Sequence, residues 1–226
     1  MRQCLFFLLL VGLSSQVMAQ KPYYAPQSHE VQAFLFNAHT NPSISNSIDG
    51  TIAFTPLSGL RYMYHIDLEN GVGLEFGRRN TDLVFSNDLT ELSAYSGEKE
   101  DLDFKLVYER KYHVYTWMIA GQAKIIYNSG SITDQGTFTN NTDFSGSYDY
   151  TNWGASVGGK LAYFFSKNLS LSAEVDAYFL QTSHELAPES RYLLFPENEW
   201  GIQTRLGVSY HFVKMPKKCA CPKVRR

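Results

Sequence analysis

The chain has 226 residues, of which 15% are aromatic and 19% charged, and its formal net charge at pH 7 is -2. This charge gives no strong electrostatic attraction to nucleic acid, so we expect no such partner. Beyond the first residues, no apolar run reaches the ~18 residues of a transmembrane helix. Past Cys4 the cysteines are Cys219 and Cys221, both close to the C-terminus, which excludes a scaffold stapled by disulfides.

The N-terminus has the pattern of a secretory signal peptide. Arg2 precedes an apolar run from Leu5 to Leu13, and Val17-Met18-Ala19 supplies small or branched residues at the cleavage positions. We expect residues 1–19 to be removed. The alternative, a retained anchor, is disfavoured because the run is shorter than the ~20 residues of a helical span. Residues 20–28 then form a polar N-terminal lead, and about 200 residues remain, which suits one domain.

Eight stretches alternate apolar and polar residues, the period of a β-strand with one apolar face. In chain order they cover residues 30–38, 51–66, 72–79, 102–111, 115–127, 153–165, 169–179 and 200–212. The first has the weakest pattern because both its faces are partly apolar. In the second, Pro56 predicts a bulge or a break.

The connections between these stretches alternate in length. Short turns are expected at 67–71, 112–114 and 166–168, and long polar loops at 80–100, 128–150 and 182–198. Membrane barrels show this alternation, with short turns inside and long loops outside. The sequence therefore predicts an all-β, eight-stranded antiparallel transmembrane β-barrel over residues 29–213. It would be integral to the outer membrane, with extracellular loops, both termini periplasmic, and a basic periplasmic tail over 214–226.

A soluble barrel with its apolar face inward is the alternative. Against it, the less apolar face is rich in glycine and serine, as a narrow crowded lumen requires. Aromatic residues also gather near strand ends, which indicates a membrane girdle. The girdle candidates are Tyr115, Trp117, Tyr127, Trp153, Tyr163, Phe165, Trp200, Tyr210 and Phe212. The same less apolar face carries charges of both signs, which must pair if they are buried. This expected lumen charge network comprises Arg61, Glu75, Arg79, Asp103, Lys105, Glu109, Lys124, Lys160, Glu174, Asp176 and Arg205.

The last stretch ends in an alternating pattern, with Leu206, Val208, Tyr210 and Phe212 on one face. Together with the strand plan, this pattern resembles the small outer-membrane barrels of the OmpA-transmembrane and OmpX type. The tyrosine-rich composition with long polar loops resembles outer-membrane β-barrel proteins of the Bacteroidetes lineage. The resemblance implies outer-membrane lipid and the barrel-assembly machinery as partners, and we expect a monomer. Family members often end at the terminal Phe, whereas this chain continues.

No metal-ligand spacing, phosphate loop or nucleophile elbow is present in the sequence, so we expect no cofactor, metal or catalytic residue. The histidines at 29, 39, 65, 113, 184 and 211 are scattered, and we interpret them as interface or lumen residues. Ser183-His184-Glu185 has the residue types of a lipid deacylase. Adjacent residues of a strand point to opposite faces, however, so Ser183 and His184 cannot easily share a proton.

Three functions remain open. The first is a non-enzymatic barrel whose lumen is closed by ion pairs, with a structural role or a surface-binding role carried by the outer loops. An open ion path is the alternative use of the same charges. The second is an accessory barrel of a secretion machinery, with the basic tail as its contact to a periplasmic partner and with Cys219 and Cys221 as tail thiols. The third is a lipid-modifying enzyme, the least favoured.

Overall fold

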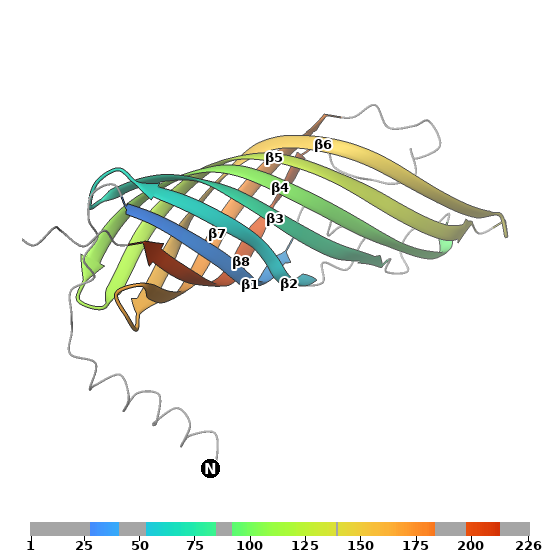
Figure 1. The fold of residues 1–226 in the computed structure, drawn as a ribbon. Coiled ribbons are helices and arrows are strands. Elements are labelled where there is room, and N and C mark those ends of the chain that lie inside the picture. The colour runs from blue at the N-terminus through green and yellow to red at the C-terminus, as the bar shows by residue number, and fades with distance from the viewer. Residues whose placement is uncertain (1–27, 41–52, 85–91, 139, 184–197, 213–226) are drawn as a thin grey trace, which may run out of the picture.

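The computed structural model describes residues 28–40, 53–84, 92–138, 140–183 and 198–212, which fold as antiparallel strands in one closed ring (Figure 1). The strands are β1 (Ser28–Thr40), β2 (Ala53–His65), β3 (Asn70–Val84), β4 (Leu92–Val114), β5 (Trp117–Phe138), β6 (Asp143–Phe164), β7 (Leu169–Ser183) and β8 (Asn198–Phe212). The all-β antiparallel barrel is confirmed. The number of eight applies to the described residues, and for the whole chain it stays a prediction. Among the described residues, no helix is long and apolar enough to cross a membrane.

The middle strands are longer than the sequence predicts. Within the expected polar loop 128–150, residues 128–138 and 143–150 form the ends of β5 and β6, with Ser129 paired to Thr151 and Thr137 to Asp143. Much of the expected loop 80–100 likewise belongs to β3 and β4. The prediction was wrong here because alternation detects a strand with one buried face. Backbone pairing continues where the outward face is polar, although Ile132 and Tyr150 remain buried on the inward face.

Two boundaries also differ near the short turns. Val114 pairs with Trp117, so the turn between β4 and β5 lies at Tyr115–Thr116, after the expected 112–114. Tyr115 has φ 55°, the left-handed conformation that such tight turns require. Ser28, assigned to the N-terminal lead, already belongs to β1.

A bulge in β1 explains its weak alternation. The partners of Phe34 and Phe36 on β8 are Gly207 and Leu206, so one extra residue of β1 lies between them. Even-numbered residues therefore point inward before the bulge, as buried Phe34 shows, and odd-numbered residues point inward after it, as buried Asn37 shows. The pairing with β2 shifts at the same place, opposite Pro56, where an irregularity was expected.

The outer surface is apolar within a band bounded by aromatic residues. On β5 the outward side chains run from Trp117, packed on Tyr163 with ring centroids 4.9 Å apart, to Tyr127, packed on Trp153 at 4.8 Å. Ten residues at about 3.4 Å each, tilted by about 40°, give a height of about 26 Å. The apolar band of outer-membrane barrels is about 25 Å tall, so this surface matches a bilayer.

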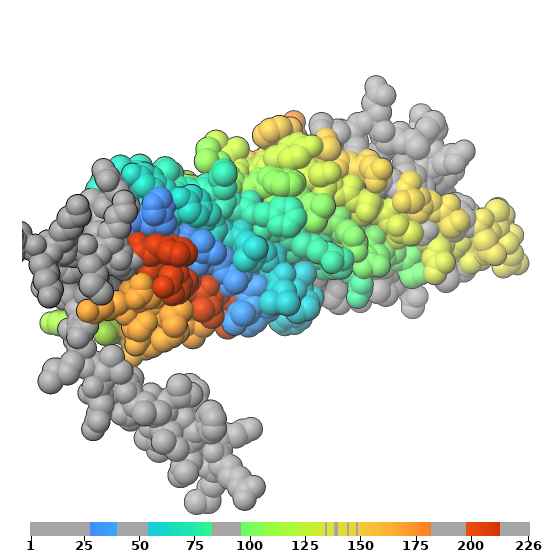
Figure 2. Space-filling view, viewed as in Figure 1, coloured from blue at the N-terminus to red at the C-terminus, as the bar shows by residue number. Residues whose placement is uncertain are grey.

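The two ends of the barrel differ. The short-turn end carries the turns after β2, β4 and β6, the start of β1 and the end of β8. At the opposite, long-strand end, β4, β5 and β6 extend beyond the other strands, and β5 and β6 form the hairpin at its tip (Figures 1 and 2). Each of these two strands has 22 residues, whereas a membrane crossing needs about 9–11. Their hairpin therefore projects past the apolar band.

Candidate functional site: the charged barrel interior

The inward face of the barrel is filled with charged side chains. Among the described residues, eight basic and eight acidic side chains are buried. They are Arg61, Arg79, Lys99, Lys105, Lys111, Lys124, Lys160 and Arg205, with Glu30, Glu75, Asp101, Asp103, Glu109, Glu174, Asp176 and Glu199. Equal numbers allow every charge to be compensated. Compensation is needed because an isolated buried ion costs several kcal/mol.

The centre of the interior is a closed ring of two arginines and two glutamates. Arg61 binds Glu174 through two parallel hydrogen bonds of 2.7 and 2.8 Å, and it donates from Nε to Glu75 at 2.8 Å. Arg205 contacts the same two carboxylates, with Nη2 2.8 Å from Glu174 Oε2. Both guanidinium groups lie over the ring of Phe34, at 4.9 and 4.1 Å from its centroid. The ring of ion pairs thus joins β2, β3, β7 and β8, and its packing on Phe34 adds β1.

Further charges surround this central ring. Lys105 Nζ lies 3.1 Å from Glu75 Oε1 and 3.3 Å from Asp103 Oδ2. Lys124 Nζ lies 2.6 Å from Asp176 Oδ2, which also accepts from Arg205 at 3.0 Å. These contacts bring β4, β5 and β7 into the same network. Strand register produces part of it directly, since Arg61 pairs with Glu75 and Glu75 with Lys105 across neighbouring strands.

A second group lies toward the long-strand end. Arg79 is placed between Asp103, at 3.1 Å from Nε, Asp101, at 3.5 Å from Nη2, and Glu199, at 3.6 Å from Nη1. Lys99 Nζ contacts Glu199 at 2.6 Å. The phenols close this layer, as Tyr150 donates to Asp101 and Tyr178 donates to Glu199.

A third group lies toward the short-turn end. Lys160 Nζ contacts Glu30 Oε1 at 2.9 Å and Glu109 Oε2 at 3.6 Å. Glu109 also accepts from Gln122 Nε2 at 2.8 Å. Past these residues, the apolar side chains of Met118, Ala162 and Phe164 pack together in the interior.

The structure places all eleven residues of the expected charge network in the interior, and each has at least one ion pair. Sequence reasoning missed five charged interior residues: Glu30, Lys99, Asp101, Lys111 and Glu199. Lys99, Asp101 and Lys111 share the odd-numbered alternation of Asp103 and Lys105, so applying the period to the whole of β4 would have found them. Glu199 continues the alternation of Gln203 and Arg205 in the same way.

The girdle candidates lie at both edges of the apolar band. Toward the short-turn end are Tyr115, Trp117, Tyr163, Phe165, Tyr210 and Phe212, and toward the long-strand end are Tyr127, Trp153 and Trp200. Tyr115 belongs to a turn and is 77% exposed. The expected signal peptide and basic tail, with Cys219 and Cys221, lie outside the described residues, as does His184-Glu185.

No protein-family model matches the chain, and no curated protein matches it in sequence. Solved structures do. A major outer membrane protein from Thermus thermophilus is 17% identical with a TM-score of 0.52, the alignment covering 83% of this chain and all of that one. OprG from Pseudomonas aeruginosa is 12% identical with a TM-score of 0.50, covering 84% of this chain and 98% of its own. Ail of Yersinia pestis is 13% identical with a TM-score of 0.47, covering 83% of this chain and 100% of its own. At these identities the likeness concerns the fold, which is that of small outer-membrane β-barrel proteins.

Proposed function

We propose that this protein is a non-enzymatic barrel of the outer membrane whose interior is sealed by ion pairs. The observation that carries the proposal is the central ring of Arg61, Glu75, Arg205 and Glu174. Such a ring spans the bore with side chains that each hold two partners. An ion entering the bore would have to break ion pairs between buried side chains, at a cost of several kcal/mol. A barrel of this size leaves room only for side chains.

The test measures ionic conductance through the barrel. The refolded protein, incorporated into planar lipid bilayers, should give little or no steady conductance. Folding is checked on the same sample by the faster migration of unheated barrels on a denaturing gel. A large, stable single-channel current from folded protein would overturn the seal and favour a porin. Resistance to extraction by alkaline carbonate tests integral membrane association.

The long-strand end supports a surface-binding role over a purely structural one. The β5–β6 hairpin continues past the apolar band, and its outward side chains there are polar, including exposed Thr133, Gln135, Ser145 and Ser147. Within the described residues, β7 pairs with β6 only from Thr151 onward, so residues 143–150 present a strand edge whose backbone groups could bind a ligand. This end would face the cell exterior. Protease added to intact cells should then cut near residues 139–142 and spare the turns at 66–69, 115–116 and 165–168, and the reverse result would invert the topology.

A further inference from the structure

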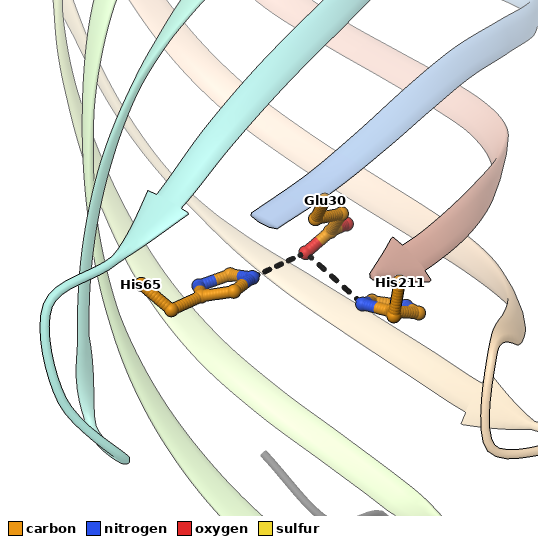
Figure 3. A group of neighbouring side chains, drawn as sticks. All are labelled: Glu30, His65 and His211. Atoms are coloured by element: carbon orange, nitrogen blue, oxygen red, sulfur yellow. Dashed lines mark ion pairs between the residues drawn. The ribbon is translucent and has the colours of Figure 1, made fainter. Parts of the chain in front are cut away.

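Three side chains able to bind a metal converge inside the short-turn end of the barrel (Figure 3). Glu30 comes from the start of β1, His65 from the end of β2 and His211 from the end of β8. Glu30 and His65 are fully buried, and His211 is 3% exposed. The three residues are far apart in the sequence, which is why no local spacing revealed them.

The separations of their ligand atoms suit a common metal ion. Glu30 Oε2 lies 3.2 Å from His65 Nε2 and 3.6 Å from His211 Nδ1. The three ligand atoms all lie within 4.8 Å of one another. Nitrogen and oxygen ligands at 2.0–2.1 Å from a tetrahedral zinc ion are separated by about 3.3–3.4 Å. Two of the three distances between ligand atoms are thus close to those around a bound zinc ion.

The surroundings orient these ligands. Within the described part of the chain, Glu30 Oε2 is buried and makes no hydrogen bond of good geometry, although its other oxygen is held by Lys160. The second ring nitrogen of His211 lies 2.9 Å from Ser170 Oγ, a hydroxyl that can accept a hydrogen bond from its N–H group. Supporting contacts of this kind fix the ring and the tautomer in metal sites.

We propose that Glu30, His65 and His211 form a binding site for a divalent transition-metal ion, and that zinc is the ion the ligands fit best. Two imidazoles and one carboxylate form a ligand set that zinc proteins use with a fourth position left to water. Magnesium and calcium prefer all-oxygen sites, so the two imidazoles select against them. The barrel would hold this ion between its first, second and last strands, a role separate from the ion-pair seal.

Lys111 opposes binding. Its Nζ contacts Nδ1 of His65. An ammonium group there can only donate, which places the ring proton on Nε2, the nitrogen that faces Glu30. Lys111→Gln removes the positive charge and provides an amide oxygen that can accept from Nδ1–H. Loss of a supporting contact costs about 10- to 100-fold in metal affinity. Removal of this opposing contact should therefore tighten zinc binding by about tenfold.

The experiment uses the full barrel refolded in detergent micelles, stripped of metal, with Cys219→Ser and Cys221→Ser so that the tail thiols cannot bind the ion. Zinc is titrated against a chromophoric chelator, and cobalt(II) is added separately to record its visible spectrum. We expect one equivalent of zinc per barrel and a tetrahedral or five-coordinate cobalt spectrum. Glu30→Gln, His65→Asn and His211→Asn should each weaken binding by at least about tenfold. His29→Asn is the matched control at the same end, since His29 contacts Tyr62 on the other face, and its affinity should be unchanged.

The proposal fails if the folded barrel binds no zinc and leaves the spectrum of aqueous cobalt unaltered. It also fails if the His65 and His211 variants, shown to be folded by their gel migration, bind as tightly as the parent. Should those variants not fold, the stoichiometry and cobalt spectrum of the parent and of Lys111→Gln decide the question alone.

Discussion

Glu174 is the side chain whose neutralisation most directly tests the interior network. It is fully buried and receives two hydrogen bonds from Arg61, one from Arg205 and one from Gln32 at 3.0 Å. Glu174→Gln keeps the volume and leaves the interior with eight positive and seven negative groups. Leaving a buried charge uncompensated costs about 3–5 kcal/mol. We therefore expect the free energy of unfolding to fall by about that amount.

The measurement is equilibrium unfolding in denaturant, with the barrel in lipid vesicles and followed by tryptophan fluorescence and gel migration. Adding Lys124→Met should offset part of the loss, by about 1 kcal/mol or more, because it restores the balance of charge and its Nζ lies 3.7 Å from Glu174. Glu100→Gln is the control. Glu100 pairs with Arg78 at 2.8 Å, but both side chains are about half exposed, so its loss should cost about 0–1 kcal/mol. A Glu174→Gln variant within about 1 kcal/mol of the parent would refute the reasoning.

Three further predictions concern other parts of the barrel. Ala123 points outward in the middle of the band, so Ala123→Arg should lower the stability of the barrel folded in a bilayer by about 2–4 kcal/mol. Thr133 lies on the same strand and face but past the band, so Thr133→Arg should cost only about 0–1 kcal/mol. Equal costs for the two variants would contradict the assigned band. Gly158→Ala should destabilise by about 1–3 kcal/mol in the same unfolding assay, because its Cβ would lie 2.3 Å from a backbone oxygen of β7. In the turn after β2, side-chain and backbone hydrogen bonds from Asn70 hold the pKa of Asp67 below its usual range. The carboxylate therefore supports this turn above its ordinary pKa and ceases to as the pH falls through the lowered value. The amide of Asn70, which donates to Asp67 Oδ1, should then show a smaller protection factor against hydrogen exchange in acid.

The membrane-facing part of the fold follows from sequence because its physical cause is local. A strand with lipid outside and a packed interior must alternate residue by residue, and this pattern appears in β3, from Val72 to Arg79, without reference to any other strand. The limits of β4, β5 and β6 were not predictable on that basis. Beyond the band the outward face is solvated, so its residues, such as exposed Thr133 and Gln135, are polar and the apolar half of the alternation is lost.

The pairing inside the bore was predictable as a set and not as individual contacts. Inward positions with both signs of charge require partners somewhere, and neighbours such as Arg61 and Glu75 could be matched once register is known. The contact of Arg61 with Glu174 crosses the bore between strands that are not neighbours in the ring. Only closure of the barrel brings these two residues together, and closure depends on strand number and stagger, which single-strand patterns do not contain.

The same dependence on closure explains why the ligand candidates were missed and gives them their significance. Glu30 and His211 lie on β1 and β8, which meet where the barrel closes, and they are directly paired in register. His65 lies on β2, which pairs with the other edge of β1, so the three residues lie across both strand pairings of β1. A ligand that contacts all three residues can bind only the closed barrel. Such a ligand stabilises the folded state, and the stabilisation grows with the logarithm of the ratio of ligand concentration to Kd. The central ring of arginines and glutamates lies across the same two pairings, because Arg61 of β2 and Arg205 of β8 both pack on Phe34 of β1. Charge pairing at the centre and metal ligands at the short-turn end are therefore two means of holding the first strand to the last.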